Sequence, residues 1–153
     1  MKGQVEKLYT TNNYKQTQKL GKDFASKILK LPKNKSAIVL GLKGNLGGGK
    51  TTFLQGFAKG LRVKDKILSP TFVILKKFKI LKNKFFKTFY HIDCYRIKNE
   101  KDILELGLKE IIKNPENIVA IEWPEKIKKV LPKKRVDIEF ELINDKHRRL
   151  TFK

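Results

Sequence analysis

The segment from Gly44 to Thr51 constrains this chain more than any other feature. It reads Gly-Asn-Leu-Gly-Gly-Gly-Lys-Thr and fits the full phosphate-loop pattern G-x-x-x-x-G-K-[ST]. An apolar run at residues 36–42 precedes it, and a helical pattern follows it over residues 50–61. A strand, a glycine-rich turn and a helix in this order present backbone N–H groups to a phosphate at a helix N-terminus. The full motif and both flanks argue against a glycine-rich turn that binds nothing, so the sequence predicts an α/β fold with a nucleotide site.

The loop residues have separate roles in such a site. Lys50 reaches the β- and γ-phosphates, and the Thr51 hydroxyl ligates Mg²⁺. The residues predicted to bind the nucleotide in this segment are Asn45, Leu46, Gly47, Gly48, Gly49, Lys50, Thr51 and Thr52. The motif does not choose among ATPase, GTPase and kinase. The Asn-Lys pairs at residues 34–35 and 83–84 lack the aspartate of a guanine-binding Asn-Lys-x-Asp loop, which favours adenine.

Two carboxylates are candidates to complete the site, because Mg²⁺ needs an acid on its far side. Glu122 ends the buried run at residues 118–121, and Asp93 ends another predicted strand. The period of two places Phe89, His91 and Asp93 on one face of that strand. An acid at a strand end is more often a cap or an ion-pair partner, and His91 is more simply a packed strand residue. With the phosphate loop, both acids are credible site residues.

The rest of the chain predicts one domain over residues 1–153. Helices are expected at residues 13–31, 99–113 with a break near Gly107, and 124–130; strands are expected at residues 71–80, 85–93, 117–122, 136–142 and 147–152. The strands at residues 71–80 and 85–93 form an antiparallel hairpin. The expected fold is a three-layer, P-loop NTPase-like α/β domain whose mixed sheet includes antiparallel strands.

The charge composition of the chain indicates which partners it could bind. Lysine and arginine number 36 against 15 acids, which gives a net charge of +21 and favours contact with nucleic acid. A lysine-rich compositional bias explains the charge equally well. The hairpin interleaves lysines with phenylalanines, and this pattern favours a buried aromatic face with a solvated lysine face over an RNA-stacking surface. The basic run at residues 126–135 has the same two interpretations.

The single cysteine excludes a disulfide scaffold, and no apolar run approaches the length of a membrane span. The first ten residues contain no apolar segment of a signal peptide. These features predict a cytoplasmic protein without membrane contact.

Four later motifs extend the pattern beyond the phosphate loop. They are Ser69-Pro70-Thr71-Phe72, His91-Ile92-Asp93-Cys94-Tyr95-Arg96, Ile121-Glu122-Trp123-Pro124-Glu125 and Leu131-Pro132. With Gly44–Thr52, this ordered set resembles the TsaE (YjeE) family of small bacterial P-loop ATPases over residues 14–149. The departures are small: Asn45 and Gly48 stand where the family usually has Asp and often Ala, and Cys94 replaces a usual Leu, which suggests an apolar role.

The resemblance implies ATP and Mg²⁺ as ligands and a role in threonylcarbamoylation of the tRNA adenosine next to the anticodon. It implies the protein partners TsaD and TsaB, with tRNA contacted within the complex. It assigns catalytic roles to Lys50, Asp93 and Glu122, the metal to Thr51 and Glu122, and a switch-like position near the phosphates to Thr71. Slow turnover by the free chain is expected, because Arg96 is the one local arginine and a salt bridge is its simpler role.

Two other functions share some of these features. A small-molecule kinase would use the same phosphate loop, but it needs several arginines around the transferred phosphate, and the central region holds only Arg62 and Arg96. A basic RNA-binding module with a regulatory nucleotide site would use the charge. Neither alternative explains the four later motifs.

Overall fold

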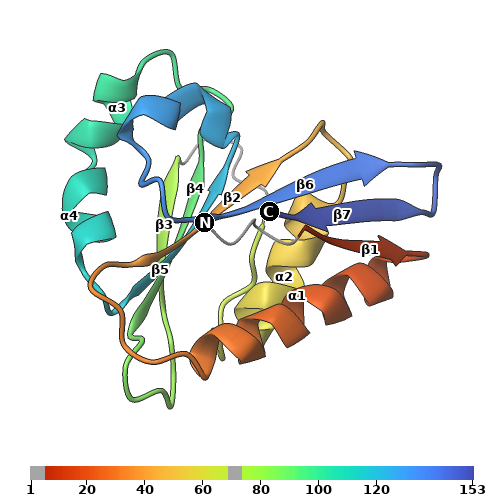
Figure 1. Cartoon of the computed structure of the whole chain (residues 1–153), viewed down its shortest axis with the longest axis horizontal. Coiled ribbons are helices and arrows are strands. Elements are labelled where there is room, and N and C mark those ends of the chain that lie inside the picture. The colour runs from red at the N-terminus through yellow and green to blue at the C-terminus, as the bar shows by residue number, and fades with distance from the viewer. Residues whose placement is uncertain (1–5, 69–73) are drawn as a thin grey trace.

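One mixed sheet of seven strands organises the computed structural model, which describes residues 6–68 and 74–153 (Figure 1). The strands are β1 (Lys7–Thr11), β2 (Ile38–Lys43), β3 (Leu75–Lys79), β4 (Thr88–Asp93), β5 (Asn117–Glu122), β6 (Val136–Leu142) and β7 (Arg148–Phe152). They lie in the order β1-β7-β6-β2-β5-β4-β3. The four central strands, β6, β2, β5 and β4, are parallel to one another, and the edge pairs are antiparallel. The predicted α/β fold with a mixed sheet is therefore confirmed.

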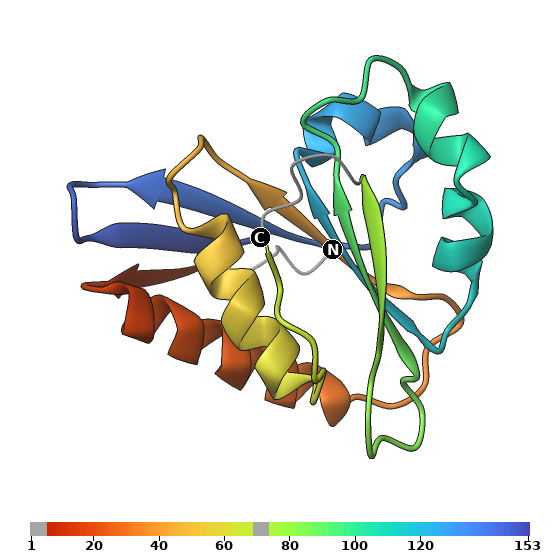
Figure 2. The same ribbon diagram turned by 180° about the vertical axis from the view of Figure 1, so that it is seen from behind.

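Helices cover both faces of this sheet (Figures 1 and 2). The helices α1 (Tyr14–Leu29) and α2 (Lys50–Gly60) lie side by side on one face. The other face carries α3 (Glu100–Glu105), α4 (Leu108–Lys113) and a 3₁₀ segment, η1 (Pro124–Val130). Two separate clusters of buried side chains fill the spaces between the layers. The three-layer arrangement follows from strands such as β5, which are buried on both faces and must be covered twice.

Capping side chains and glycine explain where two of the helices begin and end. Asn13 caps α1 by accepting a hydrogen bond from the backbone N–H of Gln16 at 2.9 Å. The break expected near Gly107 is present between α3 and α4, where Gly107 has a φ of 89°. Because a left-handed backbone favours glycine, this residue ends one helix and begins the next.

Two parts of the prediction differ from the structure. Strand β1 was not predicted, because most of its side chains are exposed and it pairs only with β7 at the sheet edge. Both strands of the hairpin begin later than expected, at Leu75 and at Thr88, and residues 71–73 of the first predicted strand lie outside the described residues. The hairpin itself is antiparallel, as predicted. Its aromatic residues Phe78, Phe86 and Phe89 are buried, which confirms the aromatic face as core.

The parallel strands bring three chain segments to one sheet edge. Gly44 follows β2 directly, while Asp93 and Glu122 are the last residues of β4 and β5. In the pairing register, Glu122 lies opposite Leu42 on one side and opposite Asp93 on the other. The carboxyl ends of parallel strands are where ligands bind in open α/β sheets, so this edge positions the site.

Close contact between α1 and α2 depends on glycines. A Cβ built on Gly56 would lie 1.9 Å from the carbonyl oxygen of Gln18, and one on Gly21 would lie 2.2 Å from that of Phe53. These contacts are with backbone atoms, which cannot move as a side chain can. The two helices therefore pack at a distance that only glycine allows.

We expect Gly56→Ala to lower the free energy of unfolding by about 2–3 kcal/mol, because the added methyl group forces α1 and α2 apart. Helix propensity alone would act in the opposite direction and stabilise the variant by about 1 kcal/mol. Urea denaturation followed by circular dichroism measures the difference. A variant at least as stable as the parent would contradict the close helix approach.

In the described part of the chain, no helix is long and apolar enough to span a membrane. Cys94 is fully buried, and burial raises the pKa of its thiol to about 12. A thiol with this pKa stays protonated near neutral pH, which agrees with the apolar role expected for Cys94.

Candidate functional site

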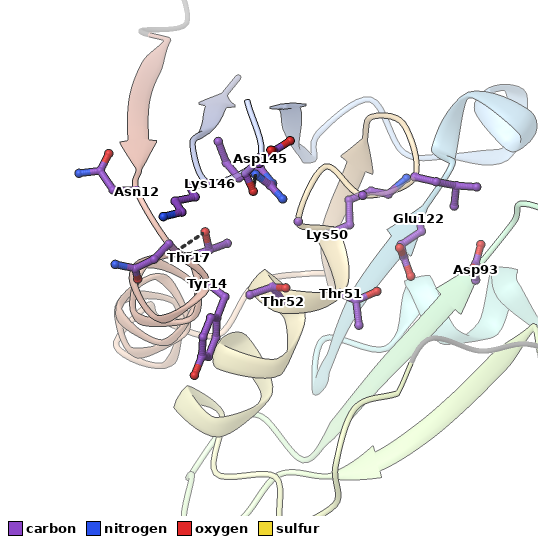
Figure 3. A pocket seen from close by; sticks show the side chains of 15 residues that line it. Asn12, Tyr14, Thr17, Lys50, Thr51, Thr52, Asp93, Glu122, Asp145 and Lys146 are labelled. Atoms are coloured by element: carbon purple, nitrogen blue, oxygen red, sulfur yellow. Dashed lines mark hydrogen bonds between the residues drawn. The ribbon is translucent and has the colours of Figure 1, made fainter. Parts of the chain in front are cut away.

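A pocket of about 780 Å³ opens where the phosphate loop meets the ends of β4 and β5 (Figure 3). The predicted site residues that line it are Leu46, Gly47, Gly49, Lys50, Thr51, Thr52, Asp93 and Glu122. Figure 3 shows Asp93 and Glu122 on one side of the start of α2, with Tyr14 and Thr17 of α1 on the other side. The structure thus brings together residues from three distant parts of the sequence.

Among the described residues, two of the predicted nucleotide-binding residues, Asn45 and Gly48, do not line this pocket. Asn45 and Gly48 shape the loop instead, because the N–H of Gly48 donates to the carbonyl oxygen of Asn45 at 3.1 Å. Thr71 lies outside the described residues, so its predicted place near the phosphates stays a prediction.

The loop backbone has the conformation of an anion cradle. Gly44, Gly47 and Gly49 have φ values of 142°, 82° and 100°. Residues that carry a Cβ atom rarely adopt such backbone conformations. A Cβ on Gly44 would lie 2.5 Å from the carbonyl oxygen of Phe140, whereas one on Gly47 would meet open space. Glycine at residue 44 therefore allows close packing on β6, and glycine at residue 47 allows the turn.

The first turn of α2 leaves its donors open. No side chain caps this helix, and no hydrogen bond within the described residues uses the backbone N–H groups of Lys50, Thr51 or Thr52. Open N–H groups at a helix N-terminus attract anions, because the helix dipole places partial positive charge there. The geometry fits a phosphate group bound by backbone atoms.

Lys50 lies inside this cradle rather than in solvent. Its side-chain ammonium donates to the carbonyl oxygen of Gly44 and lies 4.0 Å from the ring centroid of Trp123. Burial lowers the pKa of Lys50, and the nearby carboxylates of Glu122 and Asp93 oppose this shift. The ammonium is held at the loop by contacts that a phosphate oxygen could replace.

Glu122 is buried and oriented by a histidine. Its Oε2 lies 2.7 Å from the Nε2 of His91, and both side chains come from adjacent parallel strands. A carboxylate only accepts, so the histidine donates from Nε2, and its Nδ1 is left without a hydrogen-bond partner among the described residues. His91 is thus a buried, hydrogen-bonded strand residue, as predicted, and it fixes the direction of the Glu122 carboxylate.

Asp93 is more accessible than Glu122. Its Oδ1 accepts the backbone N–H of Tyr95 at 2.9 Å, and burial raises the pKa of the carboxyl group. A raised pKa makes a carboxylate a better proton acceptor near neutral pH. Asp93 therefore has the properties of a group that accepts a proton from water. Glu122 has those of a carboxylate that binds a cation.

Trp123 makes the sharp turn that follows β5. Its φ of 58° lies in the left-handed region, and its backbone N–H donates to the carbonyl oxygen of Leu42 at 3.2 Å. The ring packs on Tyr95 with centroids 5.2 Å apart. Strained backbone of this kind is concentrated at functional sites, and here it places an aromatic ring against Lys50.

The donor set fits a magnesium–nucleotide complex better than a bare metal ion. No group of three or more His, Cys, Asp or Glu side chains within the described residues could hold a metal ion alone. The Thr51 hydroxyl and the Glu122 carboxylate both line the pocket. Mg²⁺ is commonly bound by one or two protein oxygens together with phosphate oxygens and water, so these two residues match its chemistry.

The far wall of the pocket was not predicted from the sequence. It consists of Asn12, Asn13, Tyr14 and Thr17 near the start of α1, and of Asp145, Lys146 and Arg148 around the β6–β7 turn. Pairing of β1 with β7 brings these two segments together, although more than 100 residues separate them. Because β1 carries no clear alternation, the sequence offers no signal for this wall.

The expectation that Arg96 is the one local arginine is wrong. Arg148 lines the pocket, and its Cγ lies 3.7 Å from a Cβ built on Gly49, whereas Arg96 is exposed and is not a lining residue in the described chain. The Nη1 of Arg148 donates to the carbonyl oxygens of Asn144, Asp145 and His147 at 3.1–3.4 Å. These bonds hold the guanidinium at the β6–β7 turn.

Comparison with known proteins places the chain among close relatives. Residues 11–150 match the family model described as threonylcarbamoyl adenosine biosynthesis protein TsaE. The tRNA threonylcarbamoyladenosine biosynthesis protein TsaE of Bacillus subtilis is 39% identical over 114 residues, 74% of this chain and 68% of that protein. The protein of the same name from Rickettsia bellii is 38% identical over 138 residues, 90% of this chain and 88% of that protein.

A solved structure shows the same fold. The crystal structure of Bacillus subtilis YdiB superposes with a TM-score of 0.72 at 31% sequence identity. The match covers 97% of this chain and 84% of the YdiB chain.

Proposed function

This chain belongs to the TsaE family, and we propose that it is the Mg²⁺-dependent ATPase subunit that supports threonylcarbamoylation of the tRNA adenosine next to the anticodon. We expect it to act in the cytoplasm with TsaD and TsaB. The observation that carries the ATPase assignment is the meeting of the phosphate loop with Asp93 and Glu122 in one pocket.

In the proposed reaction, the triphosphate lies along the open N–H groups at the start of α2, with the ammonium of Lys50 on the β- and γ-phosphates. Thr51 and Glu122 would hold Mg²⁺, and the ion would supply charge neutralisation at the phosphates. Asp93 accepts a proton from the attacking water or orients it. His91 holds the Glu122 carboxylate in one orientation through their 2.7 Å hydrogen bond.

Slow turnover by the free chain follows from the arginine geometry. Arg148 lines the pocket, but its Nη1 is engaged by three carbonyl groups of the β6–β7 turn. An arginine finger accelerates phosphoryl transfer by about 10³–10⁵-fold, and a partner subunit is the proposed source of that acceleration. The same geometry disfavours the kinase alternative, which needs several arginines around the transferred phosphate.

Binding of Mg·ATP is expected to change the fluorescence of Trp123, the single tryptophan of the chain. The ammonium of Lys50 lies 4.0 Å from the indole centroid and must leave it to reach the phosphates. A saturable fluorescence change on titration with Mg·ATP checks this, and GTP should give a weaker response. Unchanged fluorescence with nucleotide bound, as measured by calorimetry, would contradict the movement of Lys50.

Reconstitution tests the function directly. The chain is combined with TsaD, TsaB, unmodified tRNA, threonylcarbamoyl-adenylate and Mg·ATP, and modified nucleosides per complex are counted by mass spectrometry. Many turnovers that require this chain, and that are lost with Lys50→Ala, are the expected result. Turnover indifferent to the chain, with its ATPase intact, would contradict the tRNA role and leave a P-loop hydrolase or kinase.

A further inference from the structure

A second hollow, of about 600 Å³, lies at the opposite end of α2 from the phosphate loop. Its lining comes from the second half of α1, the end of α2 and the turn between β3 and β4; the lining residues are Lys22, Ser26, Leu29, Lys30, Lys59, Gly60, Arg62, Lys82, Asn83 and Lys84. Figure 2 shows these three segments converging at one end of the molecule. We call this surface the basic hollow.

The basic hollow has an unusual charge composition. Six of its ten lining residues are lysine or arginine, and none is a carboxylate. All six side chains are exposed, and none lies within salt-bridge distance of a carboxylate in residues 6–68 and 74–153. Among the described residues, five cations elsewhere are in salt bridges: Lys19, Lys43, Arg135, Arg149 and Lys153. The hollow is distinguished by the density of its cations rather than by their lack of acids, because lysine and arginine make up 36 of the 153 residues of the chain but six of the ten that line the hollow.

Two of the cations lie on backbone that is strained and held in place by hydrogen bonds. Arg62 and Lys82 have φ values of 63° and 54°, in the left-handed region where glycine is the usual residue, and Trp123 is the other non-glycine residue of this kind in the described chain. The Nη1 of Arg62 donates to the carbonyl oxygen of Lys82 at 2.7 Å. Asn83 accepts the N–H groups of Phe85 and Phe86 at 2.9 and 2.8 Å. Glycine would relieve both strained positions, yet both carry a cation.

Positive charge continues around the end of α1. On the other side of this helix, a hollow of about 660 Å³ is also lined without a carboxylate, and its cations are Lys27, Lys33, Lys134, Arg135 and Lys153. Arg135 and Lys153 are paired with Asp137 and Glu139, which leaves three cations of this side without an acid. The end of α1 is thus flanked by cations on both sides, but the lining of this second hollow is largely apolar, so the basic hollow is the surface that suits a polyanion.

We propose that the basic hollow binds the phosphate backbone of RNA. Lysines are compact charges that suit sequence-independent phosphate contacts, and interfaces with nucleic acid are polar and strongly positive. An acidic protein partner would need an apolar centre in its contact surface, but Leu29 is the one large apolar side chain in the lining. This role goes beyond the proposed ATPase, because the basic hollow and the phosphate loop lie at opposite ends of α2.

The test compares two triple variants of the full chain by fluorescence anisotropy with labelled, unmodified tRNA. Lys22, Lys59 and Lys82 are changed to Gln in the first variant. Lys98, Lys101 and Lys109, which are exposed and lie on or beside α3 and α4, are changed to Gln in the second. Both variants lose the same net charge. We expect the first to weaken tRNA binding by about 10²-fold at ~0.1 M salt and to reduce the salt slope by about 2, with less than about a twofold change in the second.

Other variants separate binding from folding and from ATP hydrolysis. Lys82→Gly should raise the melting temperature, because it relieves a left-handed lysine, and it should still lower tRNA affinity. Lys50→Ala should leave tRNA affinity unchanged, so failure of the ATPase assignment does not affect this result. Equal losses in the two triple variants, salt-independent binding, or no binding would overturn the proposal. Equally tight binding of poly-glutamate would also overturn it and assign the basic hollow to acidic proteins.

Discussion

Lys50→Ala is expected to abolish ATP turnover, with a loss of about 10³-fold or more, while the protein stays folded. Removal of one preorganised charge from the transition state of a reaction typically costs about 10²–10³-fold, and Lys50 is proposed also to bind the ground-state phosphates. The ammonium already lies at the phosphate loop, bonded to Gly44 and placed over the ring of Trp123. The reaction therefore loses the cationic side chain that the loop places at the phosphates.

The fold should tolerate this change for an electrostatic reason. Burial lowers the pKa of Lys50, which means that the folded state disfavours its charge before any phosphate is bound. Alanine removes that cost, and the space it leaves opens into the pocket rather than into the core. Steady-state phosphate release and a thermal melt measure the two effects. Lys101→Ala on the exposed surface of α3 is the matched control and should change neither quantity.

Retained turnover in Lys50→Ala would contradict the placement of the phosphates in this loop. A collapse of the melting temperature would contradict the argument about charge burial. The two outcomes are independent, because the first concerns bound nucleotide and the second concerns the protein alone.

Substitution of Asp93 and of Glu122 is expected to have different effects on ATP binding and hydrolysis. We expect Asp93→Asn to lower turnover by about 10²–10⁴-fold with little change in nucleotide affinity, because an amide cannot accept the proton of the attacking water. We expect Glu122→Ala to weaken nucleotide binding only when Mg²⁺ is present. Titration of each variant with ATP, with and without Mg²⁺, together with phosphate release, distinguishes the two roles.

The structure supports this division. Glu122 is 4% exposed and hydrogen-bonded to His91, so its position is fixed, whereas Asp93 is partly exposed at the mouth of the pocket. Glu116→Ala provides a control, because this acid lies just before β5 at the far end of that strand from Glu122. Wild-type binding and hydrolysis by both site variants would show that the metal and the water are held elsewhere.

The two proposed surfaces place different functions at the two ends of one helix. The first turn of α2 faces the nucleotide pocket, and the residues around its last turn line the basic hollow. Gly56, between these ends, holds α2 against α1. A change in the position of α2 on nucleotide binding would therefore move the cations of the hollow. The tRNA affinity measured with and without Mg·ATP reports such coupling.

The phosphate loop, the order of most elements and the two acids at strand ends could all be predicted from the amino-acid sequence. These features depend on local rules: glycines allow the turn, alternation marks buried strands, and parallel strands end at the same sheet edge. Asp93 and Glu122 could be placed near Lys50 because each ends a predicted strand before a turn. The family motifs agreed with this placement.

The remaining features of the site depend on contacts between segments that are far apart in the sequence. Pairing of β1 with β7 brings Tyr14 and Arg148 to the pocket. The hydrophobic pattern of the sequence does not predict this pairing. The hydrogen bond from His91 to Glu122 depends on the register between β4 and β5. The basic hollow requires three segments to converge, because lysines spread through the chain become one charged surface only when α1, α2 and the β3–β4 turn pack together. A property held within one segment is therefore visible in the sequence, whereas a property of a contact between distant segments appears only when the chain folds.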